Sequence, residues 1–338
     1  MTGWKPIPLA TLLVKLESDV WHNNAGIFPS NHAHPTHQGD FLMQFCLLRT
    51  HIATALLITT ALFLPSITIG QEPVKKPAPL KILLVAGGCC HDYATQTKLL
   101  KEGIEKRIHA AVTVNYNDDK TTKATFEIYK SDDWAKGYDV VIHDECSADV
   151  TEQPYVSRIL GAHKAGIPAV NLHCAMHSYR WGDFRNPVDR GADNAGWYDM
   201  IGVQSTAHGP KLPIDVVYSN SEHAITKGFA DWTTIDEELY NNVRVYEGTT
   251  ALVTGIQMTP PNKNDLSKDP NAKAKKVSSV VAWTNEYGPN KTKIFSTSLG
   301  HQNETVGDAR YLDLVVRGVL WASGNLTADG KPSALYAK

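Results

Sequence analysis

The stretch that decides the fold is Gly166-Ile-Pro-Ala-Val-Asn-Leu-His-Cys-Ala-Met-His177. Its apolar run is bounded by glycine and proline, which is typical of a buried strand in a parallel sheet. The run ends abruptly in His173, Cys174 and His177. In open α/β sheets, ligands collect just beyond the carboxyl ends of the strands, so we expect these side chains to lie where chemistry is done.

Apolar strands and helical segments alternate on the N-terminal side of this stretch. We predict strands at 80–86, 111–116 and 138–143, and helices at 93–109 and 152–165. Strands that alternate with helices at this spacing indicate βαβ units and a parallel sheet.

The C-terminal half has a different pattern. The long loop 178–196 has no periodicity of its own, which is typical of functional loops. Beyond it, the pattern predicts three strands, a polar exposed loop, an antiparallel hairpin and a closing amphipathic helix. Their ranges are 212–218, 243–246 and 250–255 for the strands, 260–276 for the loop, 277–286 with 293–298 for the hairpin, and 308–322 for the helix.

Composition and charge limit the class of partner. The chain has 338 residues and a formal net charge of −2, with no long block of lysine or arginine. A basic patch for nucleic acid is therefore not expected, and a small neutral or weakly charged molecule is the expected partner. The sequence does not predict an oligomeric state.

The N-terminal part contains a candidate export signal. The apolar run Thr54–Ile69 follows Arg49 and precedes Gly70, as the apolar region of a secretory signal does. Because Met43 opens a normal signal peptide, we interpret 1–42 as a start-site artefact or disordered extension. The predicted parts that follow are a signal peptide at 43–70, a linker at 71–79, one domain at 80–324 and a tail at 325–338. We expect a secreted or periplasmic protein without a stable membrane partner, or a membrane-anchored one if the signal is not cleaved.

Polar side chains follow four of the predicted strands, and they are His91 with Asp92, Asp144 with Glu145, His173 with His177, and His301. Because parallel strands bring their carboxyl ends to one edge, we expect the first three of these sets to converge. His91, His173 and His301 are predicted ligands of a divalent zinc, manganese or iron ion. His173 and Asp144 are also candidates for acid/base catalysis.

Each of these residues also has a structural interpretation. Asp92 can cap the following helix, Asp144 can accept backbone hydrogen bonds, and His173 can be a core histidine. Four other histidines are predicted to be surface or supporting residues, namely His109, His143, His163 and His208.

Cysteine chemistry offers a rival interpretation. Cys174 follows a strand, as the nucleophile of a cysteine hydrolase does, but Leu172 and Met176 stand where a sharp turn favours small residues. For Cys89 and Cys90, two buried thiols are favoured over a vicinal disulfide. No dinucleotide-binding fingerprint or phosphate-binding loop occurs, which argues against a nucleotide.

The loop composition is compatible with carbohydrate. Flat aromatic faces and hydroxyl-binding groups occur together there, although the aromatic residues can instead pack the loop down. The aromatic residues are Trp181, Phe184, Trp197 and Tyr198, and the polar ones are Arg180, Asp183, Arg185 and Asn186. The predicted substrate-binding residues are Asp92, His177, Arg180, Trp181 and Arg185.

Several motifs, in their order along the chain, resemble the ThuA-like, trehalose-utilisation family. They are Gly87-Gly88 with His91-Asp92, Tyr138-Asp-Val-Val-Ile142, Leu172-His173, Glu237-Glu238-Leu239-Tyr240, Phe295-Ser-Thr-Ser-Leu-Gly-His301 and Gly318-Val-Leu-Trp321. The resemblance covers about residues 80–324. It implies an α/β, flavodoxin-like fold related to class I glutamine amidotransferases, with three layers, a mainly parallel central sheet and a C-terminal antiparallel hairpin.

The same resemblance bears on chemistry. His173 stands where the amidotransferases have their cysteine nucleophile, so glutaminase activity is not expected. Family members usually have Asp-Glu before Leu-Tyr; here Glu238 is the matching carboxylate and a further catalytic candidate.

Three functional hypotheses follow. The leading one is a secreted hydrolase or lyase of trehalose, another glycoside or a keto-glycoside, in which the histidines and Asp144 or Glu238 bind metal or move protons. The second is a non-catalytic sugar-binding module of an exported complex that binds through Trp181 and Arg185. The third is a cysteine hydrolase that uses Cys174.

Overall fold

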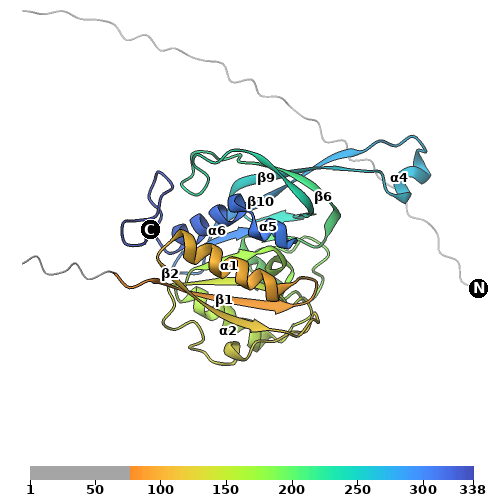
Figure 1. The fold of residues 1–338 in the computed structure, drawn as a ribbon. Helices are drawn as coiled ribbons and strands as arrows, with labels where there is room; N and C mark the ends of the chain where they lie inside the picture. The colour runs from red at the N-terminus through yellow and green to blue at the C-terminus, as the bar shows by residue number, and fades with distance from the viewer. Residues whose placement is uncertain (1–76) are drawn as a thin grey trace, which may run out of the picture. The chain divides into compact units, whose positions relative to one another are not determined.

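A nine-stranded sheet with the order β2-β1-β3-β4-β11-β10-β9-β6-β7 organises the computed structural model, which describes residues 77–338 (Figure 1). The predicted extension, the signal peptide and residues 71–76 of the linker lie outside the described residues. No helix of the described part is long and apolar enough to cross a membrane.

The first five strands in this order are parallel to their neighbours, as the sequence predicts. They are β1 (Leu80–Gly88), β2 (Ala110–Asn117), β3 (Val140–Cys146), β4 (Ala169–Leu172) and β11 (Thr292–Thr297). Ile82, Leu83 and Leu84 are all 0% exposed, although alternate residues point to opposite faces. Each such side chain contributes about 1.5–3 kcal/mol by burial, so β1 is stable only with both of its faces covered.

The rest of the sheet is antiparallel. It contains β10 (Lys275–Tyr287), β9 (Thr250–Thr259), β6 (His208–Val217) and β7 (Trp232–Tyr240). The predicted hairpin is therefore confirmed as β10 and β11. A separate two-stranded sheet pairs β5 (Val203–Gln204) with β8 (Arg244–Val245).

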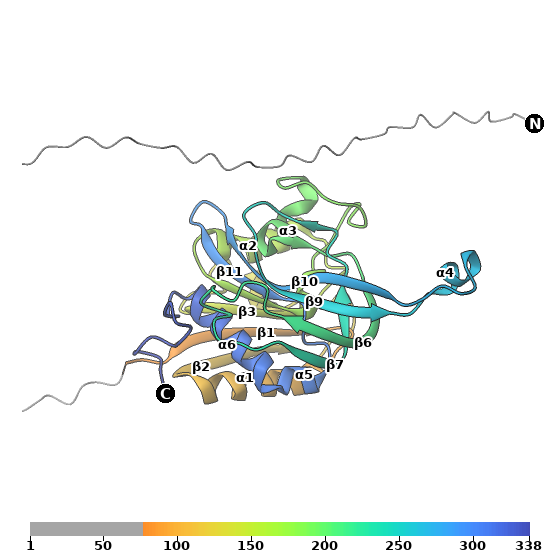
Figure 2. The same cartoon turned by 90° about the horizontal axis from the view of Figure 1, so that it is seen from above.

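Helices cover both faces of the sheet (Figure 2). The helices are α1 (Tyr93–Arg107), α2 (Gln153–Lys164), α3 (Gly196–Ile201), α4 (Lys263–Lys268), α5 (Asn303–Gly307) and α6 (Ala309–Ala322). One apolar cluster packs α1 and α6 on one face, and a second packs α2 and α3 on the other. The predicted polar loop 260–276 contains α4, whose cap Asn262 accepts from the backbone of Asn264 and Asp265.

Two sequence predictions about strands are wrong. The strand that is predicted to end at His143 continues to Cys146, because its pairing with β1 extends to Gly88 opposite Cys146. Asp144 and Glu145 therefore lie inside β3 and not after it. The strand β7 was not predicted, because Asp236, Glu237 and Glu238 make its second half look like a polar segment.

A buried chain of hydrogen bonds joins α2 to β3 through His143 and His163. The sequence predicts that these histidines are surface or supporting residues, and the surface assignment is wrong. Both imidazoles are 0% exposed. His163 Nδ1 donates to the carbonyl of Ile167 at 2.7 Å, so its Nε2 accepts from His143 Nε2 at 2.9 Å. His143 Nδ1 then faces the carboxylate of Glu145 at 2.9 Å. Burial, and next the neighbouring His143, lower the pKa of His163 to about 3.

The pH dependence of folding follows from this lowered pKa. The unfolded chain takes up a proton on His163 near pH 6.5, whereas the folded chain excludes it down to about pH 3. The contribution of His163 to stability is therefore complete above pH 6.5 and is lost as the pH falls through this window.

We predict that His163→Gln flattens the pH profile of the free energy of unfolding, measured by urea denaturation across the window. Part of the slope remains, because burial also lowers the pKa of His91 and of His177. A variant profile that coincides with the wild-type one contradicts this assignment.

Candidate functional site

His173 occupies the sharp turn where β4 ends. Its φ is +37°, in the left-handed region that non-glycine residues rarely adopt, and a short 3-10 helix (His173–His177) follows it directly. Such backbone strain costs about 1–3 kcal/mol and is typical of functional turns. The structure therefore contains a strand-to-helix elbow, and His173 rather than Cys174 stands at its apex.

The ring of His173 is oriented by the backbone. Its Nδ1 donates to the carbonyl oxygen of Ser298 at 2.7 Å, and the side chain is 2% exposed. Its Nε2 consequently points toward the carboxylate of Glu238, at 3.5 Å, and toward the hydroxyl of Tyr240, at 3.3 Å.

The carboxylate of Glu238 is the centre of a cluster of basic groups. His301 Nδ1 lies 3.4 Å from Oε1, His208 Nε2 lies 3.5 Å from it and Lys211 Nζ lies 3.7 Å from it. Burial raises the pKa of Glu238, but the hydrogen bonds and charges of His173 and His301 outweigh this effect and hold it well below its ordinary value. Glu238 is therefore an anion that faces several imidazoles.

The preceding residue, Glu237, fixes this geometry. Its carboxylate oxygens accept from the backbone N–H groups of His301 and Gln302, both at 3.0 Å, and the residue is 0% exposed. These bonds tie β7 to the loop that follows β11, although the two strands are far apart in the sheet order. Glu237 therefore holds Glu238 and His301 at a constant separation.

The structure places the three predicted ligand histidines together. The ring centroid of His91 lies 4.7 Å from that of His173 and 4.6 Å from that of His301. His91 Nε2, however, lies 3.1 Å from Cys174 Sγ. Of the three histidines, His173 and His301 face Glu238, while His91 faces the sulfur.

A pocket of about 270 Å³ opens over these residues. His91, His177, Arg180, Glu238 and His301 are among its lining residues, together with His208, Lys211 and Tyr240. Ligand pockets have volumes of about 300–1,000 Å³, so this pocket lies just below the lower end of that range and suits a small ligand.

Two predicted binding residues belong to the pocket. His177 Nε2 lies 2.9 Å from Ser205 Oγ, and its ring stacks on Tyr240 with a centroid separation of 4.2 Å. Burial, and next the charge of Arg180, lower the pKa of His177 well below its ordinary value. Arg180 donates to the carbonyl of Thr206, and its Nε has no partner among the described residues.

Besides His173, which contacts the lining residue Glu238, four other predicted site residues do not line this pocket. Asp92 is exposed and caps α1 by accepting from the N–H of Thr95 at 3.3 Å. Trp181 is half-buried, and Arg185 is exposed with its guanidinium over the ring of Phe184.

The fourth, Asp144, is 4% exposed, and its Oδ2 has no partner among residues 77–338. Burial, and next the charge of Glu145, raise its pKa well above the ordinary value. Burial therefore favours the neutral form of this carboxyl, which is not among the lining residues of the pocket.

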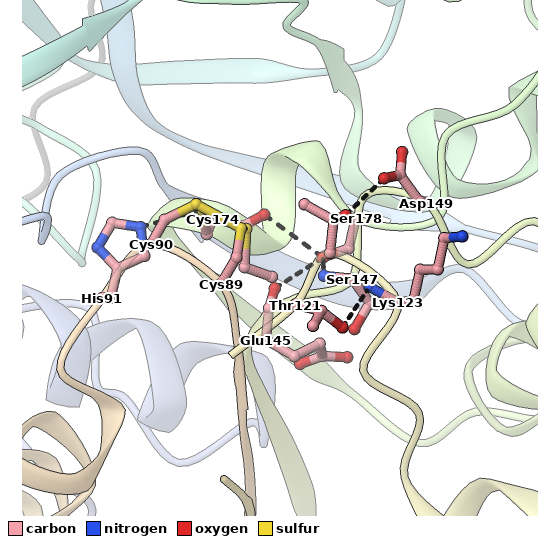
Figure 3. Close-up of a disulfide and its surroundings, with 12 residues drawn as sticks. Cys89, Cys90, His91, Thr121, Lys123, Glu145, Ser147, Asp149, Cys174 and Ser178 are labelled. Atoms are coloured by element: carbon pink, nitrogen blue, oxygen red, sulfur yellow. Dashed lines mark hydrogen bonds between the residues drawn. A yellow bond between two sulfur atoms is a disulfide. The ribbon is translucent and has the colours of Figure 1, made fainter. Parts of the chain in front are cut away.

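The cysteines differ from the prediction. Cys89 and Cys90 form a vicinal disulfide, and of the pair only Cys89 is buried (Figure 3). Cys146 and Cys174 are free and buried. The hydrogen bond to Cys146, and next burial, raise the pKa of Cys174 well above its ordinary value. An activated nucleophile needs a lowered pKa, so these surroundings do not favour the cysteine-hydrolase hypothesis.

Sequence reasoning missed three pocket residues. His208 and Lys211 lie on β6, and Tyr240 ends β7. These strands are antiparallel, so the rule about the carboxyl ends of parallel strands does not apply to them. The motif Glu237-Glu238-Leu239-Tyr240 was the one signal that pointed to this side of the pocket.

Fold and pocket together define the class: a mixed α/β protein with a histidine-carboxylate site at the carboxyl ends of its parallel strands. The family model for ThuA, described as trehalose utilisation, matches residues 81–322. The chain therefore belongs to the ThuA family, which is linked to trehalose utilisation. No curated protein matches it.

Solved structures similar to this chain share little sequence with it. A ThuA-like protein from Parabacteroides merdae is 17% identical, with a TM-score of 0.49, over 74% of this chain and 92% of that one. A ThuA-like protein from Bacteroides uniformis is 15% identical, with a TM-score of 0.48, over 75% and 94%. A cytoplasmic protein from Salmonella typhimurium is 13% identical, with a TM-score of 0.44, over 72% and 97%.

We predict that Glu237→Gln lowers the free energy of unfolding by about 1–3 kcal/mol, because two buried N–H groups lose their charged acceptor. Urea denaturation measures the change, and the exposed neighbour Asp236→Asn provides a matched control without an effect. Equal stability of both variants would show that Glu237 does not hold this loop.

Proposed function

We propose that this chain is an exported, metal-dependent enzyme of sugar catabolism, a hydrolase or lyase of trehalose, another glycoside or a keto-glycoside. The family supports the link to sugar, and the pocket supports a catalytic rather than a purely structural role. The divalent ion is zinc, manganese or iron, held by His173, Glu238 and His301.

The separation of the ligand atoms is the observation that carries the proposal. His173 Nε2 lies 3.5 Å from Oε2 of Glu238, and His301 Nδ1 lies 3.4 Å from Oε1. One ligand atom of each of the three side chains lies within 4.8 Å of the other two. Two atoms that each lie about 2.1 Å from one tetrahedral ion are about 3.4 Å apart. The two contacts with Glu238 therefore have about the length that a shared cation requires.

The orientation of His173 supports the same conclusion. Because its Nδ1 donates to Ser298, Nε2 is the ring nitrogen that faces the carboxylate of Glu238 and is available to a cation. A backbone carbonyl that fixes the second ring nitrogen is also the usual support of a metal-binding histidine.

The remaining pocket residues have roles that follow from their chemistry. A bound divalent ion would polarise a carbonyl or hydroxyl oxygen of the sugar. Arg180 and Lys211 provide positive charge that orients substrate oxygens, and the ring of Tyr240 closes one wall. His177 stays neutral because of its lowered pKa, so it can accept a substrate proton.

Of the predicted catalytic residues, we keep His173 and Glu238. Asp144 does not line the pocket, and we therefore assign it no role in catalysis.

We also propose the finer fold assignment, a flavodoxin-like three-layer architecture related to class I glutamine amidotransferases. The order of the parallel strands, β2-β1-β3-β4-β11, corresponds to the 2-1-3-4-5 order of that architecture. The pocket begins beside the switch point between β1 and β3, where such folds bind ligands. A histidine at the elbow supports an activity other than that of a glutaminase.

Metal content tests the proposal. We expect elemental analysis of the purified chain, dialysed against each ion, to find one divalent ion per chain. His173→Ala and Glu238→Gln should each lower the metal affinity at least tenfold and abolish turnover of a keto-glycoside. His109 lies at the opposite end of the parallel strands, so His109→Ala should leave the metal affinity and the turnover unchanged.

The proposal is contradicted if the dialysed protein contains no metal, does not turn over a keto-glycoside, and has the same metal affinity and turnover as His173→Ala. Saturable sugar binding that survives replacement of all three histidines would support the sugar-binding module instead.

A further inference from the structure

Three cysteines lie at or just beyond the carboxyl ends of neighbouring parallel strands. Cys146 is the last residue of β3, Cys89 directly follows β1, and Cys174 lies two residues beyond the end of β4. In β1 and β3, Gly88 pairs with Cys146, and the N–H of Cys89 donates to the carbonyl of Cys146.

The sulfur atoms are close enough to react with one another. Cys89 Sγ lies 3.3 Å from Cys146 Sγ, which lies 2.8 Å from Cys174 Sγ. Cys89 is already bonded to Cys90, so four sulfurs follow one another from the exposed Cys90 to the buried Cys174. Figure 3 shows the disulfide beside Cys174 and His91.

The backbone at the exposed end of this row is strained. Cys90 has a φ of +83°, which L residues other than Asn and Asp rarely adopt. This backbone strain at Cys90 lies beside the pocket, and strained backbone of this kind is typical of switch regions. Cys90 also lines the pocket, so a small molecule can reach its sulfur.

We propose that the four cysteines form one thiol–disulfide exchange site, in which the disulfide passes between the pair Cys89–Cys90 and the pair Cys146–Cys174. Exchange with solution occurs at Cys90, and the external reactant is a small-molecule thiol or its disulfide. This inference goes beyond the proposed function and does not depend on a bound metal.

The internal exchange is balanced in two steps. Cys146 Sγ bonds to Cys89 Sγ as the bond between Cys89 and Cys90 breaks, and Cys90 becomes a thiol. Cys174 then gives its proton to His91 Nε2, which lies 3.1 Å from its sulfur, and Cys174 Sγ bonds to Cys146 Sγ as the bond between Cys89 and Cys146 breaks. Two thiol protons are lost by Cys146 and Cys174 and two are gained by Cys89 and Cys90, so no oxidant is consumed.

The exchange reaches the candidate active site through Cys174. Its sulfur lies 3.1 Å from His91 Nε2, and its backbone directly follows the strained His173. A disulfide between Cys146 and Cys174 removes the thiol hydrogen from the contact with His91 and ties the elbow to β3. The redox state of the cysteines therefore changes the surroundings of two pocket histidines.

Disulfide mapping tests the proposal. The full chain is equilibrated in buffers of reduced and oxidised glutathione, quenched with acid, alkylated, digested and analysed by mass spectrometry. For the wild type, we expect both the intact Cys89–Cys90 pair and linked peptides that contain Cys146 and Cys174. In Cys90→Ser, the entry point for external thiols and disulfides is missing, so glutathione buffers should form the linked peptides of Cys146 and Cys174 much more slowly than in the wild type.

Cys174→Ser is the matched control, in which Cys89–Cys90 should persist and the linked peptides of the second pair should disappear. Circular dichroism checks that each variant is folded, because Cys90→Ser removes the disulfide and an exposed side chain of the pocket. Complete alkylation of Cys146 and Cys174 in every wild-type buffer overturns the proposal, and so do linked peptides of this pair that form as fast in Cys90→Ser as in the wild type. Four free cysteines protected by bound zinc or copper would overturn it as well and would indicate a thiolate metal site.

Discussion

The site depends on one buried contact, in which the carboxylate of Glu237 accepts hydrogen bonds from the backbone of His301 and Gln302. The parallel strands alone bring His91, His173 and His301 to one edge of the sheet. They do not provide the acid that those histidines face. Glu237 joins the antiparallel part of the sheet to this edge, and the next residue, Glu238, then lies among the imidazoles. The pocket is thus assembled from two halves of one sheet.

Backbone strain occurs on both sides of this pocket. His173 and Cys90 have positive φ values, and both residues directly follow or closely follow the end of a parallel strand. At each position the tight turn directs a reactive side chain toward the edge of the sheet. Two kinds of chemistry therefore lie side by side: a nitrogen and oxygen cluster around Glu238, and a row of sulfurs around Cys146.

Much of the fold could be predicted because buried parallel strands have a strong sequence signal. The apolar runs of β1, β3 and β4 predict buried strands. The parallel direction of these strands predicts that the side chains following them converge. The strand β7 lacks such a signal, since its acidic residues Glu237 and Glu238 are buried by partners that only the folded chain provides. For the same reason, His143 and Glu145 could not be recognised as members of a buried chain of hydrogen bonds.

The site could be predicted only in part. Glu238 was found through a family motif, whereas His208 and Lys211 lie on an antiparallel strand and carry no signal of their own. Nor does a pair of adjacent cysteines indicate a disulfide, because that bond requires a backbone turn that the residue types do not specify.

Cobalt substitution tests the central claim, a cation site formed by His173, Glu238 and His301, most directly. The account predicts that one Co²⁺ per chain gives the intense visible bands of a tetrahedral nitrogen and oxygen site, and that Glu238→Gln abolishes them. The absence of Co²⁺ binding, or a sulfur-to-cobalt charge-transfer band that is unaffected by Glu238→Gln, would contradict it.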